Sequence, residues 1–119
     1  LHTLVFLGQY DHEIKPHVLP DKLYKLCLAG QFNQEIKPNT LPDNLHTLKF
    51  GNKFNQVINP NTLPKHLHTL QLGEQFNKKI KRNVLPASLC LLKCSKHVRD
   101  KHFEKGAVPQ KAVIEVYFY

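Results

Sequence analysis

The feature that most constrains the fold of this chain is a period of 22 residues in its prolines. Seven of the eight prolines fall into two columns of that spacing, which are Pro20, Pro42, Pro64 and Pro86, and then Pro16, Pro38 and Pro60. A fixed period between 20 and 50 residues is typical of a solenoid, in which each repeat covers the apolar side of its neighbour. The register divides the chain into a partial repeat at 1–18, full repeats at 19–40, 41–62 and 63–84, and a degenerate repeat at 85–98.

Apolar residues recur inside each repeat and predict its local structure. In one repeat they are Leu45, Leu48 and Phe50, and the last two lie two residues apart, as in a short β-strand. The return segment contains proline and polar residues, which favours extended or 3₁₀ structure over a full helix. We therefore expect a repeat solenoid with one short parallel strand per 22-residue coil. A glycine column follows the strand, where the chain must turn, and its members are Gly8, Gly30, Gly51 and Gly73.

Two further columns are expected to hold the stacked coils together. A stacked carboxamide can donate to one loop and accept from the next, and so can pair the inward backbone groups of a tight coil. Asp11 replaces the carboxamide in the first repeat and cannot donate when ionised, which suits a position near an end. We interpret both columns as core packing and not as binding residues. The aromatic column is Phe32, Phe54 and Phe76, and the amide column is Asn33, Asn55 and Asn77.

The full pattern of one repeat, LPxxLxxLxL–G–FNxxIxP, is carried by Leu41-Pro42, Leu45, Leu48, Phe50, Gly51, Phe54-Asn55, Ile58 and Pro60. This pattern resembles the FNIP repeat, a relative of the leucine-rich repeat that is named for Phe, Asn, Ile and Pro at these spacings. The resemblance covers residues 1–94 and departs from the pattern at Arg82, where proline is expected. It implies a solenoid similar to that of leucine-rich repeats.

The resemblance also implies a function. FNIP repeats are known mainly from social amoebae and from giant viruses of amoebae, where an F-box that binds the Skp1 subunit of a ubiquitin ligase often precedes them. The resemblance therefore implies that this chain is a non-enzymatic protein–protein interaction module, the target-binding part of an F-box-type ubiquitin-ligase adaptor. A Skp1-type subunit would bind a region upstream of this chain, which opens inside a repeat. The alternative is a structural or assembly component of a viral particle or complex.

Protein targets are expected on the outward positions of the strands, which we call the strand face and which is concave in a solenoid of this kind. The inward leucines are imposed by the core, but the outward residues are free to vary. They mix histidine, threonine, lysine and a tyrosine with few acids, a composition suited to an acidic peptide or protein. A solvated face that binds nothing is the alternative reading. The candidates are Tyr24, Lys25, Cys27, His46, Thr47, Lys49, His68, Thr69, Gln71, Leu91 and Lys93.

Neither a metal site nor an active site is expected. His46 and His68 should be neighbours in one column, but no carboxylate or thiolate adjoins both of them. No nucleophile has a base and an orienting group near it, and no phosphate-binding glycine loop is present. The sequence therefore predicts no catalytic residues and no cofactor.

The basic residues are concentrated near the C-terminus. Residues 78–111 contain ten basic and two acidic residues, a difference equal to the net charge of +8 of the whole chain. Such a patch can contact phosphates or an acidic partner, although Phe103 is its one aromatic residue for base stacking. Two interpretations of these basic residues stay open, a contact with nucleic acid and a solvated face of the C-terminal cap. The candidate basic patch is Lys78, Lys79, Lys81, Arg82, Lys96, Arg99, Lys101 and Lys105.

The remaining residues, 99–119, are expected to cap the last coil. A short helix is predicted over 98–105 with Gly106 as its stop, and a strand over 111–119, either added after the last coil or packed beneath it. At the other end, 1–6 should form an exposed edge that more repeats or a partner would cover. No apolar run reaches the roughly 18 residues of a membrane span, and no signal peptide is visible. Three cysteines, an odd number, favour reduced thiols and an intracellular, cytoplasmic protein.

Overall fold

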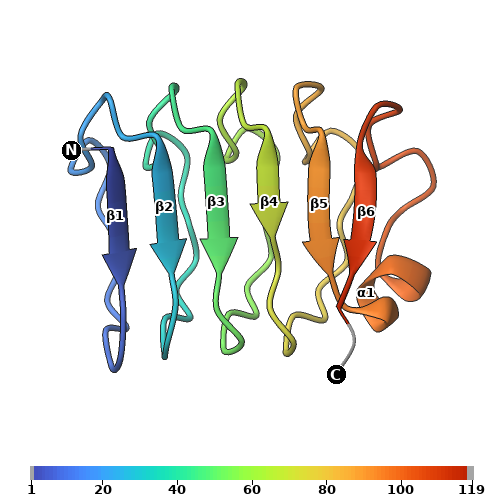
Figure 1. The fold of residues 1–119 in the computed structure, drawn as a ribbon, viewed down its shortest axis with the longest axis horizontal. Coiled ribbons are helices and arrows are strands. Elements are labelled where there is room, and N and C mark those ends of the chain that lie inside the picture. The colour runs from blue at the N-terminus through green and yellow to red at the C-terminus, as the bar shows by residue number, and fades with distance from the viewer. Residues whose placement is uncertain (1, 118–119) are drawn as a thin grey trace.

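The fold was obtained as a computed structural model, and residues 2–117 are described. Across these residues the chain forms six strands and one helix (Figure 1). The expected tail residues 118 and 119, and residue 1 of the predicted N-terminal edge, lie outside the described part. The elements are β1 (Thr3–Phe6), β2 (Lys25–Leu28), β3 (Thr47–Phe50), β4 (Thr69–Gln71), β5 (Leu91–Cys94), α1 (Lys96–Lys101) and β6 (Val113–Val116).

The strands form one parallel sheet in the order β1 to β6, and each strand pairs with the next one along the chain. Every pair between neighbouring strands joins residues 22 apart, so that Leu26 pairs with Leu48 and Leu48 with Leu70. The segments that connect β1 to β5 contain turns and bends but no helix. The predicted solenoid with one short parallel strand per 22-residue coil is confirmed.

The core lies between the sheet and the return segments. Leu26, Leu48 and Leu70 are fully buried, and the rings of Phe32, Phe54 and Phe76 stack behind them with exposures of 1% or less. Successive rings are 6.3 and 6.1 Å apart between centroids. Burying each such side chain contributes about 1.5–3 kcal/mol, and every coil depends on its neighbours for that burial.

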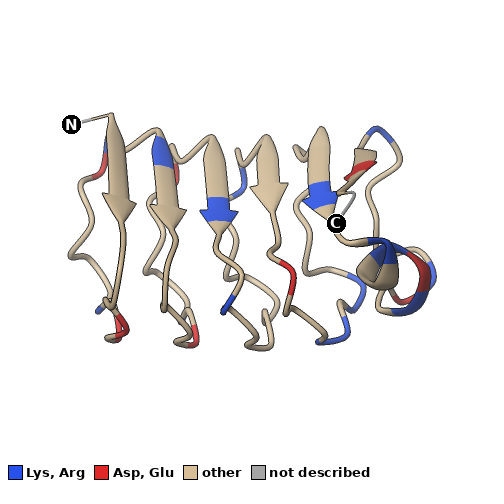
Figure 2. Ribbon diagram, turned by 60° about the horizontal axis from the view of Figure 1, so that its bottom comes forward, with Lys and Arg blue, Asp and Glu red and all other residues tan. Residues whose placement is uncertain are grey.

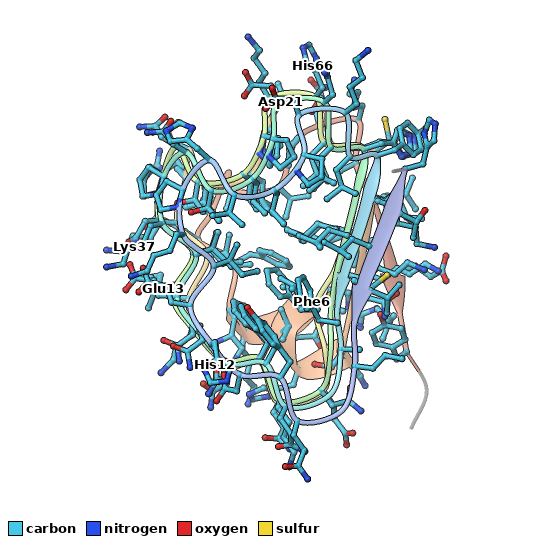
Figure 3. The ribbon with its side chains drawn as sticks, turned by 90° about the vertical axis from the view of Figure 1, so that its left-hand side faces the viewer. Phe6, His12, Glu13, Asp21, Lys37 and His66 are labelled. Atoms are coloured by element: carbon cyan, nitrogen blue, oxygen red, sulfur yellow. The ribbon has the colours of Figure 1, made fainter. Side chains whose placement is uncertain are left out.

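Within the described residues the first coil has a neighbouring coil on one side, and its core residues are less buried than those of the later coils. Leu4, Phe6 and Tyr10 are partly buried, whereas the equivalent Leu26 and Phe32 are inaccessible. Looking along the solenoid from this end, Figure 3 shows Phe6 pointing into the coil. The figure also shows polar side chains such as those of Glu13, Lys37 and Asp21 projecting outward.

The amide column forms a ladder of hydrogen bonds between coils, but with a different donor from the one expected. The backbone N–H of Asn55 donates to Oδ1 of Asn33 at 2.8 Å, and that of Asn77 donates to Asn55 at 2.9 Å. The side chain therefore acts as an acceptor, and the extra amide donor is Gln56, which also reaches Asn33 Oδ1 at 3.1 Å. Because only an acceptor is needed, Asp11 fills the same place and accepts from the next coil.

The predicted glycine column is in fact two columns. Gly8 and Gly30 turn the chain with positive φ of 68° and 69°, whereas Gly51 and Gly73 stand one position earlier in their repeats and have no positive φ. Gly73 is needed for space, because a Cβ there would collide with the backbone of Gly51. The single column was therefore wrong, since two different constraints select glycine at adjacent positions.

A second column of residues with left-handed backbone conformation was not predicted from the sequence, although three of its four members are asparagine. All four members have φ between 66° and 68° and follow the second proline column or its Arg82 replacement. Asparagine tolerates this conformation better than other residues with a Cβ. The members are His17, Asn39, Asn61 and Asn83.

The C-terminal cap keeps the 22-residue register after the sequence pattern has faded. Strand β6 pairs with β5 in parallel, with Leu92 opposite Ile114, so the tail is an added strand and is not packed beneath the coil. Between them lies α1, whose Val98 is fully buried 22 residues after Phe76. The predicted boundary at 98/99 falls inside this helix.

The bounds predicted for the helix were wrong. Ser95 is its N-cap, with Oγ accepting from the backbone N–H of Val98 at 3.2 Å, so the helix begins earlier than residue 98. His102 is the C-cap residue, and Gly106 lies beyond it as a separate left-handed turn with φ of 82°. Within the described residues no helix is long and apolar enough to cross a membrane.

Candidate functional site

The strand face is built by the alternation of buried and half-buried residues along β2, β3 and β5. The eleven predicted residues, together with Cys90, form three parallel columns, because consecutive strands pair without slippage. One column precedes the strands and the other two occupy alternate strand positions. Of these residues Thr69 is buried, with 9% of its surface exposed, so it is less accessible than was expected. The columns are Tyr24, His46, His68 and Cys90; Lys25, Thr47, Thr69 and Leu91; and Cys27, Lys49, Gln71 and Lys93.

Three rings of the first column stack face to face. The ring centroids of Tyr24 and His46 are 4.5 Å apart with planes 10° from parallel, and those of His46 and His68 are also 4.5 Å apart, at 11°. The separation follows from the spacing of neighbouring strands, about 4.8 Å. His66, which is close in sequence to His68, projects instead from an edge of the coil (Figure 3).

Each stacked imidazole is held by the threonine that follows it. Nδ1 of His46 lies 2.8 Å from Oγ1 of Thr47, and the same contact joins His68 to Thr69 at 2.8 Å. When the hydroxyl donates to Nδ1, the ring proton of neutral histidine is on Nε2. The repeated His-Thr pair was visible in the sequence, but the contact depends on side-chain rotamers and was not predicted.

The electrostatics of the ring stack favour neutral histidine. Burial lowers the pKa of His46 below its ordinary value, and the neighbouring His68 lowers it further. Both effects disfavour the charged form, because a buried cation loses hydration and two cations repel. His46 is therefore expected to be mostly neutral near pH 7 and to gain charge as the pH falls.

Lysines supply the fixed positive charge of the strand face, and Figure 2 shows them on β2, β3 and β5. Lys93 pairs with Glu115 of β6 at 3.6 Å. Among residues 2–117, Lys25 and Lys49 have no ion-pair partner. The strand face was expected to be poor in acids, and Glu115 was not recognised as part of the same surface because its repeat had lost the pattern.

The three thiols differ in their surroundings. Cys27 and Cys90 are half-buried on the strand face, and Cys90 contacts the carbonyl oxygen of Ser88 at 3.4 Å. Cys94 faces the core, where burial raises the pKa of its thiol to about 11. In the described part of the chain, no three histidine, cysteine or acidic side chains gather as metal ligands would.

The basic residues of the C-terminal third are brought together only in part. The return segment of the fourth repeat lies beside the segment after α1, through a bridge between Ile80 and Phe103 (Figure 2). Two of the cations are paired with acids, since Arg82 lies 3.2 Å from Glu104 and Arg99 lies 2.9 Å from Asp100. The patch is thus interrupted by carboxylates. The other candidates, Lys78, Lys79, Lys81, Lys96, Lys101 and Lys105, lie around these pairs in sequence.

Comparison with known families gives a match over more than half of the chain. A family model described as FNIP Repeat matches residues 32–75 and 54–96. A comparison with curated proteins gives no significant match.

A solved structure with the same fold is that of CroV588, described as a novel circular LRR protein. Its TM-score with this chain is 0.79 and its sequence is 34% identical over 90% of this chain. The chain spans 16% of the length of that protein. The similarity extends over almost all of the described solenoid.

Proposed function

The chain belongs to the FNIP-repeat family, and on this premise we propose that the strand face recognises a protein partner. Repeats of this kind with a leucine-rich-repeat fold are typically non-enzymatic interaction modules. The observation that carries the proposal is the strand face itself. Its stacked rings lie outside the buried core, and Lys25 and Lys49 have no ion-pair partner among residues 2–117, so packing does not require these residues there.

Selection of random dodecapeptides by phage display on the immobilised chain tests this proposal. Peptides that use the strand face are expected to lose at least tenfold in affinity with Gln71→Trp, which places a large side chain between β3 and β5. They should retain their affinity with the control Val57→Trp, because Val57 is 49% exposed in a return segment. Equal binding to both variants would show that the strand face is not the recognition surface.

The finer proposal is that this module holds the target of an F-box-type ubiquitin-ligase adaptor, with Skp1 bound elsewhere in the longer polypeptide. Family membership supports it. Co-purification of Skp1 with the complete native polypeptide, and its loss on deletion of the F-box region, is the expected result. Absence of Skp1 from the purified complex would count against it.

An assembly role is the alternative, and the circular shape named for CroV588 gives it a specific basis. In that case the ends of the solenoid, and not the strand face, would make the contacts. Light scattering of the complete polypeptide would then show a defined oligomer that persists with Gln71→Trp. A monomer at micromolar concentration would argue against this alternative.

A further inference from the structure

We propose that the stacked rings and lysines of the strand face recognise carboxylates, so that the partner is an acidic, extended protein segment. This inference rests on the proposed function and specifies the chemistry of the partner. It depends on four residues at the centre of the face, His46, His68, Lys25 and Lys49.

One nitrogen atom of each stacked histidine ring is available to a ligand. Nδ1 of each histidine is occupied by a threonine hydroxyl at 2.8 Å. Within residues 2–117, Nε2 of neither ring has a hydrogen-bond partner, and neither atom is among the fully buried unpaired ones. Nε2 is therefore the ring atom that a ligand can contact, and with the threonine donating it carries the proton.

The available donors of the two rings lie side by side. The two imidazoles are nearly parallel, 4.5 Å apart, and are held by the same contact in consecutive coils. Their Nε2 atoms are therefore separated by a similar distance and face the same way. Two N–H donors on the same side of the stack can each donate to a carboxylate oxygen of an acidic segment, and charge on the ring would strengthen both bonds.

Lysines beside the ring stack give the centre of the strand face a positive charge. Lys25 and Lys49 flank the ring stack on β2 and β3, with no ion-pair partner among the described residues. The acid of the same sheet, Glu115, lies on β6 and is committed to Lys93 at 3.6 Å. The centre of the face thus offers donors and cations without acceptors of opposite charge, which is complementary to a segment rich in aspartate or glutamate.

The stacking argues against nucleic acid as the occupant. Binding of single strands depends on aromatic faces that accept bases. Here the rings of Tyr24, His46 and His68 cover one another's faces and present their edges. Edges with N–H groups suit hydrogen bonds to carboxylates better than base stacking.

The test uses a fluorescein-labelled decapeptide of alternating glutamate and serine and its glutamine counterpart, with a twelve-residue oligothymidylate as a third probe. The glutamate peptide is expected to bind at least tenfold more tightly than the other two. The double substitution His46→Gln with His68→Gln, and separately Lys49→Gln, should each reduce its affinity at least fivefold. His66→Gln and Lys53→Gln remove an exposed histidine and lysine away from the strand face and should leave the affinity unchanged.

The pH dependence gives an independent readout. The titratable side chains next to the two rings on this surface are Tyr24, Lys25, Lys49 and Cys90. A bound carboxylate stabilises imidazolium, so affinity should rise at least threefold from pH 7.5 to 5.5, where glutamate remains ionised. The rise should persist in His66→Gln and disappear in the double histidine variant.

Equal affinity for the glutamate and glutamine peptides would overturn the inference, as would binding that is indifferent to both the histidine and the Lys49 substitutions. Preferential binding of oligothymidylate would overturn it in favour of nucleic acid. Circular dichroism checks that the variants are folded, and Lys49→Gln removes no hydrogen bond of the described structure. If peptides from the phage selection respond to Gln71→Trp but the glutamate peptide does not bind, the proposed function stands and this inference fails.

Discussion

The buried hydroxyls of Thr40 and Thr62 lead to a prediction that the repeat itself allows to be checked. These side chains are 2% and 4% exposed, and their Oγ1 atoms have no hydrogen-bond partner in the described structure. The equivalent position in the fourth repeat is Val84, which is 4% exposed. The fold thus accommodates a methyl group in place of the hydroxyl at this position.

Removing an unpaired buried hydroxyl should stabilise the chain. The cost of burying such a group without a partner is about 1–3 kcal/mol in proteins, and valine has nearly the same shape as threonine. We expect Thr40→Val and Thr62→Val each to raise the free energy of unfolding by about 1 kcal/mol, the lower end of that range. For a chain of this size, this corresponds to a rise in Tm of roughly 4 °C.

Urea unfolding followed by circular dichroism is the assay, because the chain has no tryptophan to serve as a fluorescent probe. The reverse change Val84→Thr should lower stability by about 1 kcal/mol. Thr3→Val, at an exposed position of β1, is the control and should have little effect. A loss of stability in Thr62→Val, or none in Val84→Thr, would refute the reasoning that these hydroxyls are buried without compensation.

Three other predictions concern the ladder, the turns and the thiols. The backbone N–H of Asn33 in the next coil lowers the pKa of Asp11 in the folded chain. Ionised Asp11 therefore stabilises the fold at pH values above its unfolded pKa, and this stabilisation is lost as the pH falls through its folded pKa. Asp11→Asn should therefore reduce the loss of stability measured below about pH 4, and an unchanged acid limb would contradict this. Gly73→Ala should destabilise the chain by about 1–3 kcal/mol in urea unfolding, because its Cβ meets the backbone of Gly51; wild-type stability would disprove this contact. Iodoacetamide at pH 8 should label two cysteines of the folded chain and spare Cys94, whose thiol has a pKa of about 11, until urea is added; mass spectrometry showing equal labelling would exclude its burial.

Much of the fold could be predicted because the repeat reports the same constraint several times. Each coil must bury the same leucines and the same phenylalanine against its neighbour, so Leu48 and Phe54 recur with their counterparts at the period. The outward residues of the strand face followed from the alternation along the strands. Their binding role remains a proposal. Packing restricts which residues can occupy the core, so the core can be predicted from the sequence, but it does not restrict exposed residues in the same way.

The cap was harder to predict because its sequence no longer repeats. Strand β6 was expected, but the sequence left two placements open for it. Backbone hydrogen bonds decide between them, since the N–H of Val113 donates to the carbonyl oxygen of Cys90 at 2.8 Å. A hydrogen bond between main chains requires no particular side chain, and the 22-residue register therefore continued where no sequence pattern marked it.

By itself, the sequence determined the 22-residue coil, the parallel strands and the inward side chains, because these depend on spacing along the chain. The tertiary structure alone decided how neighbouring coils use their polar groups. It placed His46 against His68, gave each ring a threonine partner, and made the Asn33 side chain an acceptor. It also paired Arg82 with Glu104 and so divided a run of charge that looked continuous. These contacts depend on rotamers and on distances between coils, which residue order does not specify.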